Sequence, residues 1–343
     1  MPAYTPSPKP PNDRQIENPM TEHYDDTDDL AERTLSNRQV LGFIGAFWLR
    51  RPVLFWTSVV LTLVAIGFDL ALPWAAGRLM DIVAAGPDQA DLAWRAWAIF
   101  IGVFLAFTVV RNIAFRFWNP MAAANMKDMT DEGFQRVQSY SSDWHANTFA
   151  GSTVRRLSRG MWGYDMVSDA VILWLGPALI VLVGLSVMMI ARWPVVGAFS
   201  LAVVILYLVS NLWLTTVYVR PANLKSVALD SRIGGALSDS IGSNPTVKAF
   251  GAEAREEARI GGVTALWRRL TLTTWTRFIN VWLWHNLMLV GLQAGLTGLL
   301  LRLWSQGQAS AGDVVFAITA FMLMSGYLRN LGENIRIDRK SVV

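Results

Sequence analysis

Six long apolar runs constrain this chain more than any other feature of its sequence. They are VLFWTSVVLTLVAIGF (53–68), AWAIFIGVFLAFTVV (96–110), AVILWLGPALIVLVGLSVMMIA (170–191), VVGAFSLAVVILYLVSNLWLTTVYV (195–219), INVWLWHNLMLVGLQAGLTGLLL (279–301) and VVFAITAFMLMSGYL (314–328). A membrane-spanning helix needs about 20 mainly apolar residues, and neutral flanks can extend a shorter run. Buried helices of a large soluble protein are the alternative, but they are rarely this long and this uniformly apolar. The runs therefore predict an all-α polytopic membrane protein with six transmembrane helices, over about 53–75, 94–117, 169–191, 194–219, 277–303 and 312–329.

The composition agrees with this class and excludes some kinds of site. Charged residues make up 16% of the chain, against about 25% in an ordinary soluble domain. The chain has no cysteine, which excludes disulfides and thiolate metal sites, and its three scattered histidines do not form a ligand cluster. We therefore expect no metal site, and the net charge of +4 does not indicate nucleic-acid binding.

The N-terminal segment divides into two expected parts. Residues 1–35 are rich in proline and then in acids, and they have no apolar core of the kind that a cleaved signal peptide requires. We predict a disordered cytoplasmic tail there. Residues 36–52 are apolar on one side and end in Arg50 and Arg51, which suits an interfacial elbow helix on the inner leaflet. A cytoplasmic extension of the first span is the alternative.

The placement of basic residues predicts the orientation of the spans. The connections after the first, third and fifth spans are short and contain few basic residues, whereas those after the second and fourth are long and basic. Positive charge stays on the cytoplasmic side. The long connections and both termini are therefore expected in the cytoplasm, and we expect a protein of the bacterial inner membrane. The basic residues that carry this argument are Arg136, Arg155, Arg156, Arg159, Arg220, Lys225, Arg232, Lys248, Arg255, Arg259, Arg268, Arg269, Arg50, Arg51, Arg329, Arg336, Arg339 and Lys340.

Each long connection has the pattern of two helices joined by a short break. Helical spacing runs through 221–242, stops at GSNP (242–245) and resumes over 246–270, where Gly251, Gly261 and Gly262 weaken the helix without forcing an end. Asn244 is the expected N-cap there, with Pro245 in the first turn. Residues 119–144 and 153–169 flank a similar break at 145–152. At ~1.5 Å per residue, we expect two helical hairpins that project ~30–40 Å beyond the bilayer.

This arrangement, together with two local motifs, resembles the transmembrane domain of type I ABC exporters. GFQRVQSYSSDWHANTFAGSTVRRLSRG (133–160) is similar to the family's first intracellular loop, with Gly151 and Arg156 at the matching positions. ALSDSIGSNPTVKAFGAEAREEARI (236–260) is similar to the second loop, through Asp239, Gly242, Val247, Lys248, Phe250 and Glu253. The resemblance covers about 37–340. Two positions depart from the family pattern: Gly160 stands where an acid is common, and Asp239 where glutamate is common.

The resemblance implies that the hairpin turns couple the spans to an ATPase domain. The implied first coupling element contains Asp143, Trp144, His145, Asn147 and Phe149, and the implied second contains Leu237, Asp239, Ser240, Ile241 and Gly242. The alternative is that Trp144 and Phe149 only pack within the turn. It also implies a second copy or homologous half-transporter, with ATP and Mg bound by the associated nucleotide-binding domain. The chain contains no G-x-x-x-x-G-K-[ST] motif, so ATP hydrolysis is not assigned to its residues. We expect that domain either in a longer form of this chain or in a separate polypeptide.

The substrate path is expected along one face of the fifth span. Trp282, Asn286, Gln293 and Thr297 follow helical spacing and share this face. They could line a cavity for an amphipathic or hydrophobic substrate, or they could form hydrogen bonds between helices. His285, beside this face, is expected to be a packed polar residue.

The expected function is the permease domain of an ATP-driven exporter. Two alternatives stay open: a secondary transporter or channel that works without ATP, and a membrane scaffold or sensor that transports nothing. No internal inverted repeat favours the secondary transporter, and Asp69, the only acid well inside a predicted span, is expected near the outer end of that span.

Overall fold

The computed structural model describes residues 37–147 and 150–337. Within these ranges every regular element is helical, which confirms the predicted all-α fold. Contacts divide the described residues into two units, the first ending at Ala46 and the second beginning at Phe47. Helix α1 (Asn37–Trp48) falls largely in the first unit and covers most of the predicted elbow. The predicted tail over residues 1–35 lies outside the described residues.

Six helices of the described chain are long and apolar enough to cross a membrane, as predicted. They are α2 (Pro52–Ala84); α3 (Ala90–Gln138), entered through η1 (Pro87–Gln89); α5 (Ala150–Asp169) continued by η2 (Ala170–Leu175) and α6 (Gly176–Arg192); α7 (Pro194–Trp213) continued by η3 (Leu214–Val219) and α8 (Arg220–Gly242); α10 (Glu253–Ser305); and α11 (Ala311–Ile337). Each predicted span falls inside one of these helices.

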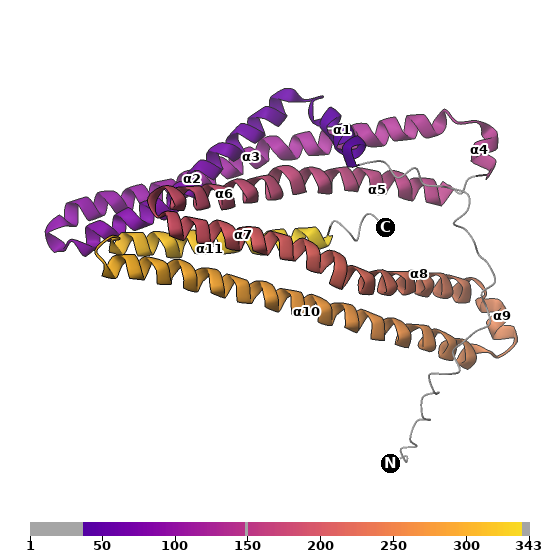
Figure 1. Cartoon of the computed structure of the whole chain (residues 1–343). Coiled ribbons are helices and arrows are strands. Elements are labelled where there is room, and N and C mark those ends of the chain that lie inside the picture. The colour runs from indigo at the N-terminus through magenta and orange to yellow at the C-terminus, as the bar shows by residue number, and fades with distance from the viewer. Residues whose placement is uncertain (1–36, 148–149, 338–343) are drawn as a thin grey trace, which may run out of the picture. The chain divides into compact units, whose positions relative to one another are not determined.

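The six helices connect through two kinds of link, which lie at opposite ends of the second unit (Figure 1). The links at 85–89, at Trp193 and at 306–310 are short turns, and we call this the turn end. The other two links contain the short helices α4 (Ser142–Asn147) and α9 (Asn244–Ala249), and we call this the hairpin end. Proline stands in the first turn of α2, α7 and α9, where its missing N–H costs no hydrogen bond.

Two clusters hold the helices together near the turn end and in the middle. The larger cluster joins α6, α7, α10 and α11 through fully buried residues such as Leu185, Val196, Leu296 and Ala320. The smaller one joins α2, α3 and η2 through Phe55, Trp118, Met121 and Leu173. The outward faces of these helices are apolar as well. Large exposed side chains there include Val53, Leu105, Val195 and Val290, as expected for surfaces that contact lipid.

Both π-helical segments immediately precede a proline in an otherwise continuous helix. Segment η2 ends two residues before Pro177, and η3 ends two residues before Pro221. An interior proline lacks the N–H for the normal helical hydrogen bond, and its ring clashes with the carbonyl four residues earlier. A wider turn relieves that clash without ending the helix. The helices therefore continue from the apolar region into the hairpins.

Candidate functional site

The first candidate coupling element forms a short helix at the tip of the α3–α5 hairpin (Figure 1). Helix α3 ends at Gln138, and α4 starts after a turn in which the Trp144 amide donates a hydrogen bond to Ser141 Oγ at 3.3 Å. The Trp144 ring is half-buried between Tyr140, at a centroid distance of 4.6 Å, and His145, at 5.1 Å. Trp144 therefore packs within the turn.

For most of the remaining predicted residues of this element, the structure gives a location but no test of their role. Asp143 and His145 are exposed side chains of α4, and Asn147 is its last residue. Phe149 lies outside the described residues. The role of this element in coupling stays a prediction.

The second candidate element lies at the end of α8, and α9, the short helix at the tip of this hairpin, is not part of it. The predicted residues Leu237, Asp239, Ser240, Ile241 and Gly242 form the last turns of α8. The tip itself is α9, which begins at Asn244 and is followed by Phe250. Ile241 is 72% exposed and Phe250 is 79% exposed, so both present apolar surface to the surroundings.

Two local expectations about this tip were wrong. The N-cap of α9 is Ser243, and the expected cap Asn244 is already the first helical residue. The predicted helix over 246–270 is broken at Gly251, which has a φ of +54°. A left-handed residue ends a helix, and α10 starts afresh at Glu253. The glycine was visible in the sequence, but its left-handed conformation was not.

Polar contacts join the two arms of the second hairpin along their length. Near the tip, Glu256 accepts hydrogen bonds from Arg259 and Ser240, which together lower its pKa to about 2. Further along, the Ser226 and Thr271 hydroxyls lie 2.7 Å apart. Beyond them, Arg277 donates to the Tyr218 carbonyl at 2.6 Å. These contacts bind α8 and η3 to α10, so the two arms of the hairpin form one rigid unit.

A buried polar network at the base of the first hairpin was not predicted. Asn125 Nδ2 donates to the Tyr164 hydroxyl at 2.6 Å, and both residues are buried. Arg51 donates to Asn125 Oδ1 and pairs with Asp128 at 2.8 Å. Trp48 Nε1 donates to Ser168 Oγ at 3.1 Å. The network ties the chain just before α2 to both arms of the hairpin. The sequence signal for this network is limited to the pair Arg50 and Arg51, whose charges also support the predicted orientation.

The predicted substrate face of α10 is only partly available for binding. Asn286 Nδ2 donates to the Trp282 carbonyl at 2.8 Å, and Thr297 Oγ1 donates to the Gln293 carbonyl at 2.7 Å. These side chains therefore bond to their own helix. Gln293 Oε1 is buried and has no hydrogen-bond partner among the described residues. His285 is buried with its ring 4.5 Å from that of Tyr207, so it packs as expected.

Comparisons with known proteins agree with this architecture. A family model described as ABC transporter transmembrane region matches residues 55–328. The ATM1-type heavy metal exporter of Novosphingobium aromaticivorans is 25% identical over 304 residues, which make up 86% of this chain and 49% of that protein. The solved structure of a bacterial Atm1-family ABC exporter with ATP bound matches with a TM-score of 0.70 at 21% identity.

That structural match covers 85% of this chain and 52% of the solved chain. The chain therefore spans about half the length of both proteins. The match confirms the predicted type I exporter fold, and the family model covers most of the described residues. The chain belongs to the family of ABC transporter transmembrane regions.

Proposed function

We propose that this chain is the permease domain of an ATP-driven exporter. In this function it moves its substrate by alternating access when an ATPase domain binds its hairpin end. The observation that carries the proposal is the tip of the second hairpin. There, Ile241 and Phe250 expose large apolar surfaces at the end of a hairpin whose two arms are joined by polar contacts.

The partner that fits this tip is a nucleotide-binding domain with bound ATP and Mg, in the same or a separate polypeptide. Large aromatic side chains contribute most of the binding energy at small interfaces. Phe250 is the strongest candidate for that role, since Trp144 of the first tip already packs against Tyr140 and His145. Asp143, His145, Asn147 and Phe149 complete the first proposed coupling element. The second proposed coupling element consists of Leu237, Asp239, Ser240, Ile241 and Gly242, which precede α9.

Coupling requires that movement at the tips reaches the spans. A partner can shift an equilibrium between two conformations only through contacts that differ between them. The hairpin arms continue into the spans without a loop, because η2 and η3 keep the helices continuous. We propose that a second copy or a homologous half-transporter completes the pathway. We also propose that the hairpins and both termini face the cytoplasm of a bacterial cell.

The substrate is proposed in two classes. The relative from Novosphingobium is named a heavy metal exporter, so heavy metal ions and their complexes are the first cargo to test. Amphipathic or hydrophobic molecules are the second class, favoured by the largely apolar spans. On the proposed substrate face of Trp282, Asn286, Gln293 and Thr297, Gln293 Oε1 is buried without a hydrogen-bond partner among the described residues, so its binding to cargo requires a conformation that exposes it.

The test is transport by the chain together with its ATPase domain in sealed vesicles. We expect ATP-dependent movement of cargo, and we expect Phe250→Ala to reduce it by ~10-fold or more, since a hot-spot residue contributes ~2 kcal/mol. Phe134→Ala is the matched control. Phe134 is also an exposed phenylalanine, but it lies in α3, on an arm of the other hairpin and away from the tip of the second.

Three outcomes would contradict the proposal. Transport driven by an ion gradient without ATP would identify a secondary transporter. ATP hydrolysis without movement of any cargo would favour a scaffold or sensor. Full transport by Phe250→Ala would remove the coupling role from this tip.

A further inference from the structure

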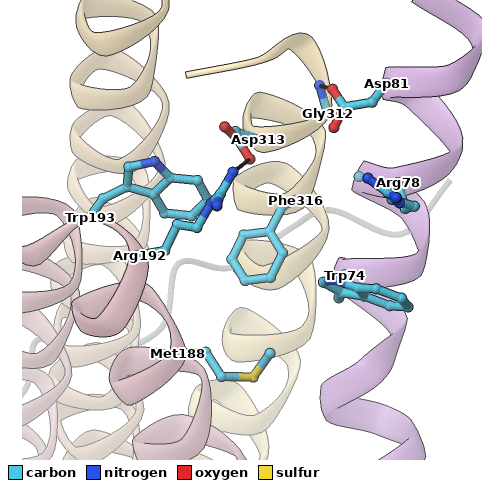
Figure 2. A pocket seen from close by; sticks show the side chains of 10 residues that line it. Trp74, Arg78, Asp81, Met188, Arg192, Trp193, Gly312, Asp313 and Phe316 are labelled. Atoms are coloured by element: carbon cyan, nitrogen blue, oxygen red, sulfur yellow. Dashed lines mark hydrogen bonds and ion pairs between the residues drawn. The ribbon is translucent and has the colours of Figure 1, made fainter. Parts of the chain in front are cut away.

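A cavity of about 280 Å³ opens among α2, α6 and α11 at the turn end (Figure 2). Its inner wall is apolar. Trp193 and Phe316 are buried with their ring centroids 5.7 Å apart, and Met188 lies on the same side. A charged rim surrounds this wall, formed by Arg78, Asp81, Arg192 and Asp313. The cavity therefore has an apolar interior and a polar entrance.

Both acids of the rim already have donors. Asp81 Oδ1 accepts a hydrogen bond from the Gly312 amide at 2.7 Å, which holds α2 against the start of α11. Asp313 Oδ2 accepts from the Ser310 amide at 2.8 Å, and its other oxygen lies 3.8 Å from the Arg192 guanidinium. The two carboxylates thus fix the helix ends.

The two arginine side chains of the rim are held less closely than the two acids. Arg78 is exposed, and no hydrogen bond or ion pair engages it within the described residues. Arg192 is mostly exposed, and its guanidinium lies 5.5 Å from the Trp193 ring in addition to its long pair with Asp313. Figure 2 shows Arg78 and Trp74 on successive turns of α2, both on the side that faces the cavity. The groups left to bind a ligand are therefore two guanidinium groups and aromatic surface.

We propose that this cavity binds an amphipathic anion. Its carboxylate or phosphate group contacts Arg78, with Arg192 as the second cation, and its adjoining carbon atoms contact Met188 and Phe316. Guanidinium groups bind planar or tetrahedral oxyanions through paired hydrogen bonds. Pockets that enclose a whole drug-sized ligand measure about 300–1,000 Å³. This cavity holds a head group and a short apolar stretch, and the rest of the molecule extends past exposed Trp74.

Two sources offer this chemistry: a free amphiphile such as a fatty acid anion, and the head group of an anionic phospholipid. Binding at this site requires neither ATP nor transport, so it is independent of the proposed function. A negative result in the export assay would not contradict anion binding by the cavity. A negative result in the binding assay would not contradict the proposed export function.

The test is photolabelling of the full chain in phosphatidylcholine nanodiscs. The probe is dodecanoate with a diazirine on a carbon close to the carboxylate, compared with a dodecylammonium probe of the same length that carries the diazirine at the matching position. We expect the anionic probe to label peptides containing Trp74, Met188 or Phe316 saturably, and the cationic probe not to do so. Arg78→Gln should weaken this labelling about tenfold, which corresponds to ~1.4 kcal/mol. Arg78→Lys should weaken the labelling less than Arg78→Gln does, because the charge is kept while the paired hydrogen bonds are lost.

Arg95→Gln is the matched control. Arg95 is an exposed arginine near the turn end of α3 that does not line the cavity. Equal labelling by both probes, or labelling unchanged in Arg78→Gln, would overturn the proposal. Added phosphatidylglycerol and added free dodecanoate then separate the sources. Displacement of the probe by the lipid identifies a bilayer ligand, and displacement by dodecanoate alone identifies a free amphiphile.

Discussion

Gly77 lies where α2 and α11 approach closely, and the neighbouring backbone leaves no room for a side chain. A methyl group on Gly77 would lie 2.6 Å from the Gly312 carbonyl oxygen and 3.3 Å from Phe316 Cβ. The first neighbour is backbone, which cannot rotate away. We predict that Gly77→Ala destabilises the protein by about 1–3 kcal/mol, the usual cost of overpacking. The measurement is thermal unfolding of the purified protein in detergent.

The control for this prediction lies in the same helix. Gly67 has nothing within 4 Å of an added methyl group, so Gly67→Ala meets no steric conflict. Alanine also favours a helix interior over glycine by about 0.5–1 kcal/mol. Gly67→Ala should therefore leave the melting temperature unchanged or raise it. Equal effects of the two substitutions on the melting temperature would show that α2 and α11 are farther apart at Gly77 than in this structure.

Glu256 makes the second hairpin sensitive to acid. Hydrogen bonds from Arg259 and Ser240 hold its pKa at about 2, below its ordinary value of 4.5. A lowered pKa contributes stability that is present above pH 4.5 and is lost as the pH falls toward 2. We predict that the arms of the hairpin separate near the tip in this pH window. Spin labels at Ile241→Cys and Ala258→Cys can report the separation without competing thiols, since the chain has no cysteine.

Glu256→Gln provides the check on this mechanism. Glutamine cannot titrate, so the labelled pair should give the same spacing across the window from pH 4.5 to 2. If the spacing still changes with pH in that variant, another group controls the tip.

At the scale of elements, two prolines explain why the hairpin arms are continuous with the spans and yet locally irregular. Pro221 follows η3, and restoring an N–H at this position removes the reason for the wide turn. We predict that Pro221→Ala raises thermal stability, by up to about 3 kcal/mol, and reduces transport by the ATPase-coupled protein, because the wide turn that joins the hairpin arm to the span becomes regular helix. Thermal unfolding and vesicle transport measure the two effects.

The matched control for this prediction is Pro194→Ala. Pro194 stands in the first turn of α7, where no helical hydrogen bond is missing, so its replacement should change neither quantity much. A stabilised Pro221→Ala protein with unchanged transport would show that the wide turn has no part in the motion.

The sequence predicted the elements well where one-dimensional patterns determine them. Apolar run length and helical spacing gave six spanning helices and two hairpins, because both depend on neighbouring residues alone. It failed at Gly251, where the same residue is compatible with a continued helix or a left-handed end. It also missed the network of Arg51, Asn125 and Tyr164, since those contacts join segments up to 74 residues apart. The coupling and substrate residues stay predictions.

At the scale of the whole molecule, helix length determines which end can lie outside the bilayer. Helix α10 has 53 residues, or ~80 Å at ~1.5 Å per residue, and the apolar core of a bilayer is ~30 Å thick. More than half of α10 therefore lies outside that core. Its turn end is joined to α11 by the short link 306–310, so the excess lies at the hairpin end.

This geometry gives a prediction about sidedness that uses single cysteines in the cysteine-free chain. We expect a membrane-impermeant maleimide to label Ile241→Cys only in inside-out vesicles, because basic hairpins stay cytoplasmic. Asp88→Cys and Gln308→Cys, at the turn end, should react only in right-side-out vesicles. Labelling of Ile241→Cys from outside the cell would place the hairpins away from any cytoplasmic ATPase. An ATP-driven mechanism acting through α9 would then be impossible, even though the fold itself would stand.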